Sequence, residues 1–297
     1  MMQKFFEKKL EKYNCKFDLL DELVEKQEEA SNYYAWVRDN YKKYFIGADS
    51  LTKSKFCIRY YRAKKLLYSS VKMLIEAKCS LENECIVGYY YLIYYALFQA
   101  MQANLIICIH YDDNKVIQLT HENVKIYFDE EFCKNKKCPL DDEIISLIED
   151  LRKFREYYSY AMPFNLSDKA IIDMDKVEYY ISICIQLFNL HCFIIRNDVT
   201  KSIEFDYINE DEIEQYFKQA CNRLGYDCFT DEADKNFWNE YKHIGGMDIM
   251  PPSLTFSHDF DEFGTYDSDV YEAMRIQRTQ RLIARALSFF YDTIGGI

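Results

Sequence analysis

The sequence contains few residues that interrupt helices. Only 8 of its 297 residues are glycine and only 4 are proline, and these two residue types disfavour the interior of a helix more than any others. Apolar residues recur three and four positions apart over long stretches, whereas a half-buried strand requires strict alternation. We therefore predict an all-α protein. Its length fits one large domain or a domain with appendages.

The chain also has no recognisable export signal and no excess of positive charge. Its N-terminal run, MMQKFFEKKLEKY, mixes charged and apolar residues without a hydrophobic core of signal-peptide length. The 11 cysteines are scattered through apolar helical stretches, as is typical of reduced thiols. These features predict a cytoplasmic protein. Because the net charge is −12, contact with nucleic acid requires a local basic cluster.

The pattern of breaks predicts three regions. Around residue 49 the chain is interrupted, and Ser50 or Thr52 is suited to cap the helix that follows. The N-terminal region is expected to pack on the main body, with a partner-binding arm as the alternative. The regions are a helical extension (1–48), a helical bundle (50–198) and a C-terminal helical region (199–297) with a long loop at 244–268.

In two helical stretches of the bundle region, the distribution of charged residues predicts which surfaces are buried. From Cys85 to His110 there is no Asp, Glu, Lys or Arg, and the run is long enough to cross a bilayer. Because it contains polar amides and five tyrosines, we predict a central core helix and no membrane. The preceding stretch, 56–78, is expected to present one core face and one basic face, with Arg59 among the basic residues.

Four motifs recur in the order of a known family. They are YRAKKLL at 61–67, GYYYLIYYALFQA at 88–100, THENV at 120–124 and LRKFR at 151–155. Over residues 59–195 the order and spacing of these motifs resemble the HEPN superfamily of helical domains that act on RNA and nucleotides.

The resemblance implies a four- to five-helix up-and-down bundle, assembled as a homodimer. It also implies a place in a bacterial or phage conflict system, either toxin–antitoxin or anti-phage defence. The partners it implies are RNA or a nucleotide and a protein such as a cognate antitoxin, and no cofactor is expected. Catalytic members carry an arginine, four to six further residues and a histidine. In this chain Arg155 is followed at that spacing by Tyr160.

Metal-independent RNA cleavage needs a base, an acid and a cation beside the phosphorus. Arg155 is suited to be the cation, but an unperturbed phenol titrates about three units above neutrality, so Tyr160 is a poor substitute for histidine. Two hypotheses follow. One is an endoribonuclease with a degenerate Arg-x4-Tyr motif, and the other is a catalytically inactive module that binds a protein partner or nucleotide.

The residues around Arg155 are also suited to binding. Arg152 lies three positions earlier on the same helical face, and Tyr158 with Tyr160 could stack on a base. The alternative is that the arginines satisfy the carbonyl groups at a helix C-terminus.

Two further candidate groups lie toward the C-terminus. His243 follows Asn239 at the spacing of the nuclease motif, with Trp238 in place of arginine and Lys242 adjacent. We predict His243 as an acid–base residue and Asn239 and Lys242 as RNA contacts. The second group is a cationic stripe, which is either a phosphate rail or a partner for the acidic segment 204–214 or a second subunit. Its members are Arg275, Arg278, Arg281 and Arg285.

Three other histidines, His110, His121 and His191, lie within or beside apolar helices and are predicted to be structural. Cys133 and Cys138 lack a second pair at zinc-site spacing, so no metal site is predicted.

Overall fold

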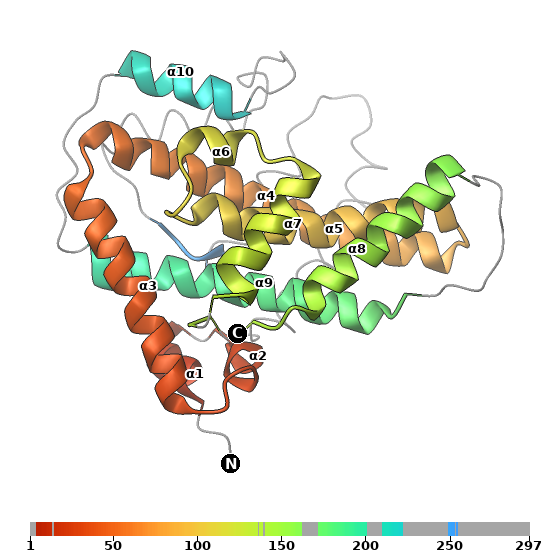
Figure 1. Cartoon of the computed structure of the whole chain (residues 1–297), viewed down its shortest axis with the longest axis horizontal. Helices are drawn as coiled ribbons and strands as arrows, with labels where there is room; N and C mark the ends of the chain where they lie inside the picture. Colours follow the sequence, from red (N-terminus) through yellow and green to blue (C-terminus); the bar gives the residue numbers. More distant parts are fainter. Residues whose placement is uncertain are drawn as a thin grey trace, which may run out of the picture.

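The computed structural model describes residues 4–13, 15–135, 137–138, 140–161, 172–200, 210–221, 249–252 and 254. Within these ranges the regular structure is helical and contains no strand (Figure 1), which confirms the all-α prediction for this part of the chain. The α-helices are α1 (Phe5–Leu10), α2 (Asp18–Glu22), α3 (Gln27–Gly47), α4 (Ser50–Glu82), α5 (Ile86–Ile107), α6 (Asp113–Ile117), α7 (His121–Phe128), α8 (Glu143–Glu156), α9 (Met174–Ile194) and α10 (Glu210–Cys221). Shorter helical segments are the 3-10 helix η1 (Glu11–Tyr13) and the π-helical η2 (Asp129–Cys133), η3 (Tyr157–Ala161) and η4 (Ile195–Val199).

Helices α4 and α5 form a hairpin at the centre of the molecule (Figure 1). The side chain of Asp49 accepts a hydrogen bond from the backbone nitrogen of Thr52 at 2.7 Å. Asp49 is therefore the cap of α4, and the prediction of Ser50 or Thr52 was wrong by one to three positions. The helix ends at Glu82, and Glu84 in the turn that follows adopts φ of 57°. There the backbone nitrogen of Cys85 donates to the carbonyl oxygen of Ser80 at 2.8 Å, which is the hydrogen bond of a Schellman motif.

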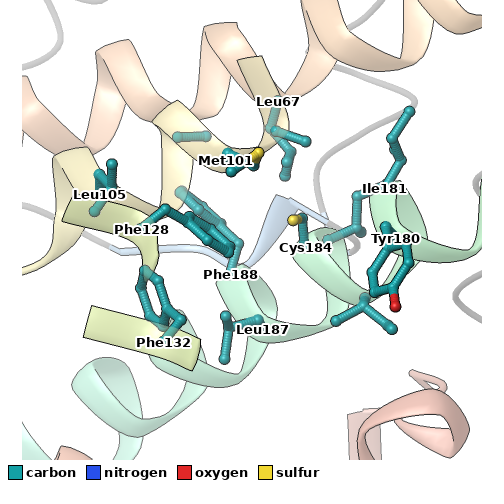
Figure 2. Packing of buried hydrophobic residues seen from close by; sticks show 14 of the residues in the cluster. Leu67, Met101, Leu105, Phe128, Phe132, Tyr180, Ile181, Cys184, Leu187 and Phe188 are labelled. Atoms are coloured by element: carbon teal, nitrogen blue, oxygen red, sulfur yellow. The ribbon is translucent and has the colours of Figure 1, made fainter. Parts of the chain in front are cut away.

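Helix α5 is the centre of the core, as its uncharged sequence predicted. It packs against α4, α7, α8 and α9. Figure 2 shows Met101 and Leu105 of α5 beside Phe128 of α7 and Phe188 of α9, and all four side chains are fully buried. Each buried side chain of this size contributes about 1.5–3 kcal/mol of transfer free energy, so this apolar cluster is the main source of stability.

The N-terminal helices pack on the same body. Phe6, Phe17 and Phe45 are fully buried in the hydrophobic cluster that also contains α5 and α9. The carboxylate of Asp21 in α2 accepts hydrogen bonds from the backbone nitrogens at the start of α1, with distances of 2.9 to 3.1 Å. These contacts confirm the expectation that this region packs on the main body. The predicted regional boundaries remain predictions.

Arg59 lies inside the protein and not on the expected basic face of α4. Its side chain is 4% exposed. Its guanidinium donates to the carbonyl oxygens of Ile106 at 2.8 Å and Cys108 at 2.6 Å. The last carbonyl groups of a helix have no donor within it. Arg59 therefore caps the C-terminus of α5 from a neighbouring helix.

In the described part of the chain, the helix with the length and composition of a membrane span is Met174–Val199. In Met174–Val199, 89% of the most apolar window is buried. The surrounding helices cover it, as they cover the core helix of a soluble protein.

Candidate functional site

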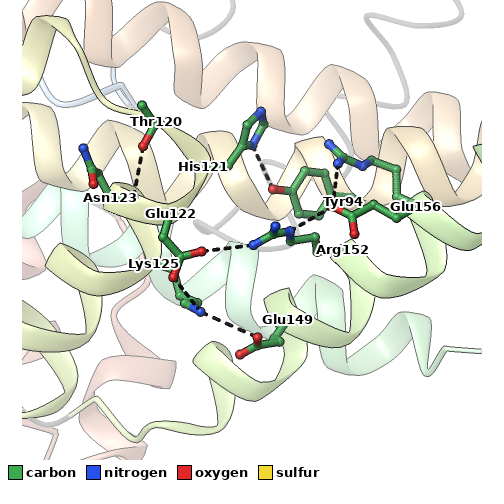
Figure 3. A network of polar contacts seen from close by, with 10 residues as sticks. Tyr94, Thr120, His121, Glu122, Asn123, Lys125, Glu149, Arg152 and Glu156 are labelled. Carbon is green, nitrogen blue, oxygen red and sulfur yellow. Dashed lines mark hydrogen bonds and ion pairs between the residues drawn. The ribbon is translucent and has the colours of Figure 1, made fainter. Parts of the chain in front are cut away.

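Polar and aromatic side chains meet where α5, α7 and α8 come together (Figure 3). Helix α5 contributes Tyr94 and Tyr95, α7 contributes His121, and α8 contributes Arg155. We call these four residues the His–Arg cluster. The ring of His121 lies 5.7 Å from that of Tyr94 and 5.6 Å from that of Tyr95, between centroids. The guanidinium carbon of Arg155 lies 4.6 and 5.8 Å from the same two centroids.

The local sequence explains the positions of His121 and Arg155. Thr120 caps α7, its hydroxyl oxygen accepting from the backbone nitrogen of Asn123 at 3.3 Å. His121 is consequently the first residue of the helix, and its side chain is exposed. On α8, Arg152 and Arg155 are three residues apart and project from one face. The cluster therefore combines a helix start with a helix face.

The hydrogen bond between Tyr94 and His121 determines the tautomer of the imidazole. The Tyr94 hydroxyl lies 2.8 Å from Nδ1 of His121. Burial raises the pKa of Tyr94 to about 12, so the phenol keeps its proton at neutral pH. Nδ1 is the hydrogen-bond partner of this hydroxyl among the described residues, so the hydroxyl donates to it. The neutral imidazole then carries its proton on Nε2.

Arg155 is held rigidly against the two tyrosines. Its side chain is only 12% exposed, and a guanidinium over an aromatic face is attracted more strongly when desolvated. Nη1 donates to the Tyr95 hydroxyl at 3.3 Å, and Nη2 lies 3.2 Å from Oε1 of Glu156. Nε is buried without a hydrogen-bond partner among the described residues. The cluster thus contains a fixed cation with an unused donor.

Ion pairs surround the cluster and balance its charge (Figure 3). Arg152 contacts Glu122 at 3.0 Å and Glu156 at 2.9 Å. Lys125 contacts Glu122 at 3.0 Å and Glu149 at 3.6 Å. The glutamates offset the charge of the cations, so a phosphate would be recognised at short range rather than by long-range attraction.

Exposed tyrosines lie beside the cluster. Tyr91 packs on Tyr95 with centroids 4.7 Å apart, and it is one of the exposed large side chains. Tyr157 and Tyr160 are exposed on η3, which follows α8 and packs against α5. Aromatic faces of this kind can stack on unpaired bases. The surface combines stacking groups with a cation and a histidine.

The four site residues predicted in this region have different surroundings in the structure. Arg152 and Arg155 lie at the cluster. Tyr160 is 75% exposed and has no hydrogen bond or ring contact within the described ranges. Tyr158 is buried and stacks on Tyr90, with centroids 4.7 Å apart and planes 6° from parallel. The ring of Tyr158 is therefore a core element and does not face solvent.

The remaining predicted site residues lie outside the described residues, so their roles stay predictions. They are Asn239, Lys242, His243, Arg275, Arg278, Arg281 and Arg285.

Sequence reasoning assigned His121 to a structural role and overlooked the pairing of Tyr94 with it. One signal was present: a threonine directly before the histidine indicates a helix start, where side chains are accessible. The expectation for His191 is supported, because His191 is buried and hydrogen-bonded to two tyrosines. His110 is partly exposed and paired with Glu131.

Comparison with protein-family models, with curated proteins and with solved structures gives no match. The likeness to the HEPN superfamily therefore depends on the four sequence motifs alone.

Proposed function

We propose that this chain is a cytoplasmic HEPN-like protein of a bacterial or phage conflict system, which cleaves RNA at the His–Arg cluster without a metal. One observation carries the proposal: His121 and Arg155, from different helices, contact the same two tyrosines. His121 would supply the histidine that is missing after Arg155 in the sequence motif. The four helices packed around α5 are compatible with the family's bundle.

The chemistry follows from the proton positions. The 2′-oxygen of RNA attacks the adjacent phosphorus, and the bond from phosphorus to the 5′-oxygen breaks. Arg155 stabilises the negative charge that develops on the phosphoryl oxygens. His121 in its protonated, imidazolium form donates the Nε2 proton to the departing 5′-oxygen and becomes neutral, and the 2′-hydroxyl proton passes to solvent. The products carry a 2′,3′-cyclic phosphate and a 5′-hydroxyl.

The test is a cleavage assay on single-stranded and structured RNA in the presence of EDTA. We expect His121→Gln and Arg155→Ala each to lower the rate by about 100-fold or more, the usual contribution of a general acid or a charge-stabilising donor. Lys153→Ala is the matched control, since Lys153 lies on α8 and its side chain is 68% exposed. A substrate with 2′-deoxyribose at the cleaved position should be inert. Cleavage that survives both cluster substitutions would refute the assignment.

A second function is favoured by the ion pairs that engage Arg152 with Glu122 and Glu156. In this alternative the chain is a catalytically inactive module that binds RNA, a nucleotide or a protein such as an antitoxin. Binding of RNA by the wild-type chain without cleavage, abolished by Arg155→Ala, would select it. In either case we propose a homodimer, which sedimentation or light scattering would test.

A further inference from the structure

A thiol, an imidazole and a carboxylate lie close together at the C-terminal end of α5. The donor atoms of Cys108, His110 and Glu131 all lie within 4.8 Å of one another. Tyr94 and Ile107 are 13 positions apart on α5, which corresponds to about 20 Å of helix at 1.5 Å per residue. This group is therefore separate from the His–Arg cluster.

We propose that Cys108, His110 and Glu131 bind one zinc ion, with a fourth position open to water. The pairing of soft sulfur with imidazole nitrogen favours zinc over magnesium or calcium, which prefer oxygen ligands. Three protein ligands and one exchangeable position are a common arrangement for zinc. The imidazole of His110 is 40% exposed, so water has access to the ion.

The distance from Cys108 to His110 fits this assignment, whereas that from His110 to Glu131 is shorter than a shared zinc ion requires. Sγ of Cys108 lies 3.6 Å from Nδ1 of His110. Bond lengths of about 2.3 Å to sulfur and about 2.0 Å to nitrogen at a tetrahedral angle place these two atoms about 3.5 Å apart. Nδ1 of His110 lies 2.7 Å from Oε1 of Glu131, and the corresponding zinc-bound edge is about 3.4 Å. A small rotation of the Glu131 side chain would open the space.

The backbone explains why the three groups face one another. Cys108 is the C-cap of α5 with an extended backbone, and the chain turns at Ile109 and His110 directly after it. This turn leaves Nδ1 of His110 facing the thiol of Cys108. Glu131 lies on η2, one of the π-helical segments, which often occur at functional sites. The site would join the end of α5 to η2.

Metal binding at this site has to displace protons from two of the ligands. Burial, and to a lesser degree Glu131, raises the pKa of the Cys108 thiol well above its usual range. Glu131 raises the pKa of His110 by hydrogen bonding. Zinc binding would release the thiol proton and neutralise both anionic ligands. The nearby guanidinium of Arg59 is directed to backbone carbonyls and lies 3.4 Å from the carboxylate of Asp113.

The packing around the imidazole limits its motion. The ring of Trp36 on α3 lies 5.5 Å from that of His110, between centroids. Nζ of Lys137 lies 5.8 Å from the centroid of the same Trp36 ring. A ligand restrained in this way loses less conformational freedom on binding a metal.

The experiment is titration of the reduced full-length protein with zinc chloride in competition with a chromophoric chelator. We expect one high-affinity zinc per chain, and His110→Ala and Glu131→Gln each to weaken it by at least about tenfold, the lower end for loss of a supporting group. Cobalt chloride in place of zinc should give a sulfur-to-cobalt charge-transfer band, lost in Cys108→Ser. Cys85→Ser is the matched control, because Cys85 is exposed in the turn between α4 and α5.

Folding of each variant is checked by far-ultraviolet circular dichroism. Because His110 is half-exposed, His110→Ala keeps the test informative if Cys108→Ser fails to fold. Zinc affinity unchanged in His110→Ala and Glu131→Gln, or no binding by the wild-type chain, would overturn the proposal. In that case the three groups are an ordinary ion pair with a thiol hydrogen bond. Since cleavage at the His–Arg cluster needs no metal, an RNA assay with EDTA separates the two proposals.

Discussion

The hydroxyl of Tyr94 and Nδ1 of His121 are 2.8 Å apart, and this contact fixes both the orientation and the tautomer of an exposed imidazole. Tyr94 is buried in α5, whereas His121 begins α7. A buried residue of one helix therefore determines how a surface residue of another presents its proton.

Tyr94→Phe should slow RNA cleavage about threefold to tenfold, because the hydrogen bond that orients His121 is worth about 0.5–1.5 kcal/mol. Single-turnover rates and thermal unfolding would be measured together. Tyr89→Phe is the control, since the buried Tyr89 hydroxyl has no hydrogen-bond partner among the described residues. If the two variants cleave equally fast, Tyr94 does not position the histidine.

Substitutions of Tyr160 distinguish a catalytic phenol from a stacking surface. Tyr160 is 75% exposed, so we expect Tyr160→Phe to retain cleavage and RNA affinity. Tyr160→Ala should weaken RNA binding by about 1–3 kcal/mol, the usual value for loss of one base–aromatic stack. Fluorescence anisotropy with labelled single-stranded RNA measures the affinities. A rate that falls equally in both variants would instead assign a chemical role to the hydroxyl.

Arg59→Met should destabilise the fold by about 3–5 kcal/mol, the range for breaking a buried charged network. The carbonyl oxygens of Ile106 and Cys108 would lose their charged donor. Lys72→Met is the control, because Lys72 is an exposed residue of the same helix. Such a surface substitution should change the free energy of unfolding by no more than about 0.5 kcal/mol. Urea unfolding provides both values. Similar midpoints for the two variants would show that the buried guanidinium contributes little.

His191 should make the protein less stable in acid. Tyr41 donates its proton to the carbonyl oxygen of Ile107 at 3.0 Å and therefore accepts from Nδ1 of His191, while Nε2 accepts from Tyr33. Burial lowers the pKa of His191 from 6.5 to about 3. The unfolded chain therefore binds a proton below pH 6.5 that the folded chain binds only near pH 3.

Between those two values the free energy of unfolding should fall with decreasing pH by up to about 1.4 kcal/mol per unit, in addition to the effects of other groups. In His191→Gln this contribution disappears, so its stability should depend less steeply on pH from 6.5 to 4.5, although it is lower at pH 7.5. Chemical unfolding at a series of pH values provides the comparison. Parallel curves would mean that His191 does not titrate on unfolding.

Glu84→Gly should stabilise the turn between α4 and α5. Glu84 adopts φ of 57°, a left-handed conformation that costs a residue with a Cβ atom about 1–2 kcal/mol and costs glycine little. After the greater entropy of unfolded glycine is subtracted, a gain of about 0.5 kcal/mol remains. Glu76→Gly, in the interior of α4, should lower stability by about 0.5–1 kcal/mol. A melting temperature that rises in Glu84→Gly and falls in the variant with glycine inside α4 would support this account.

The helical class and the identity of the core helix follow from the amino-acid sequence alone. Apolar residues spaced three and four apart, with few glycines and prolines, leave helix as the structure that buries one continuous face. The absence of charge from Cys85 to Tyr111 identified α5 as the element enclosed by the others. Both are local properties, which a single segment reveals without its neighbours.

Which polar groups meet depends on how the helices pack. Arg155 was recognised from its helix, but Tyr94, which it contacts, and His121, which contacts the same tyrosine, lie 61 and 34 positions earlier in the chain. Periodicity shows which face of a helix is apolar and does not show which other helix packs on it. The same limit applies to Arg59, which looked like part of a basic face and instead caps α5, because burying a cation depends on carbonyl groups that only the packed helices supply.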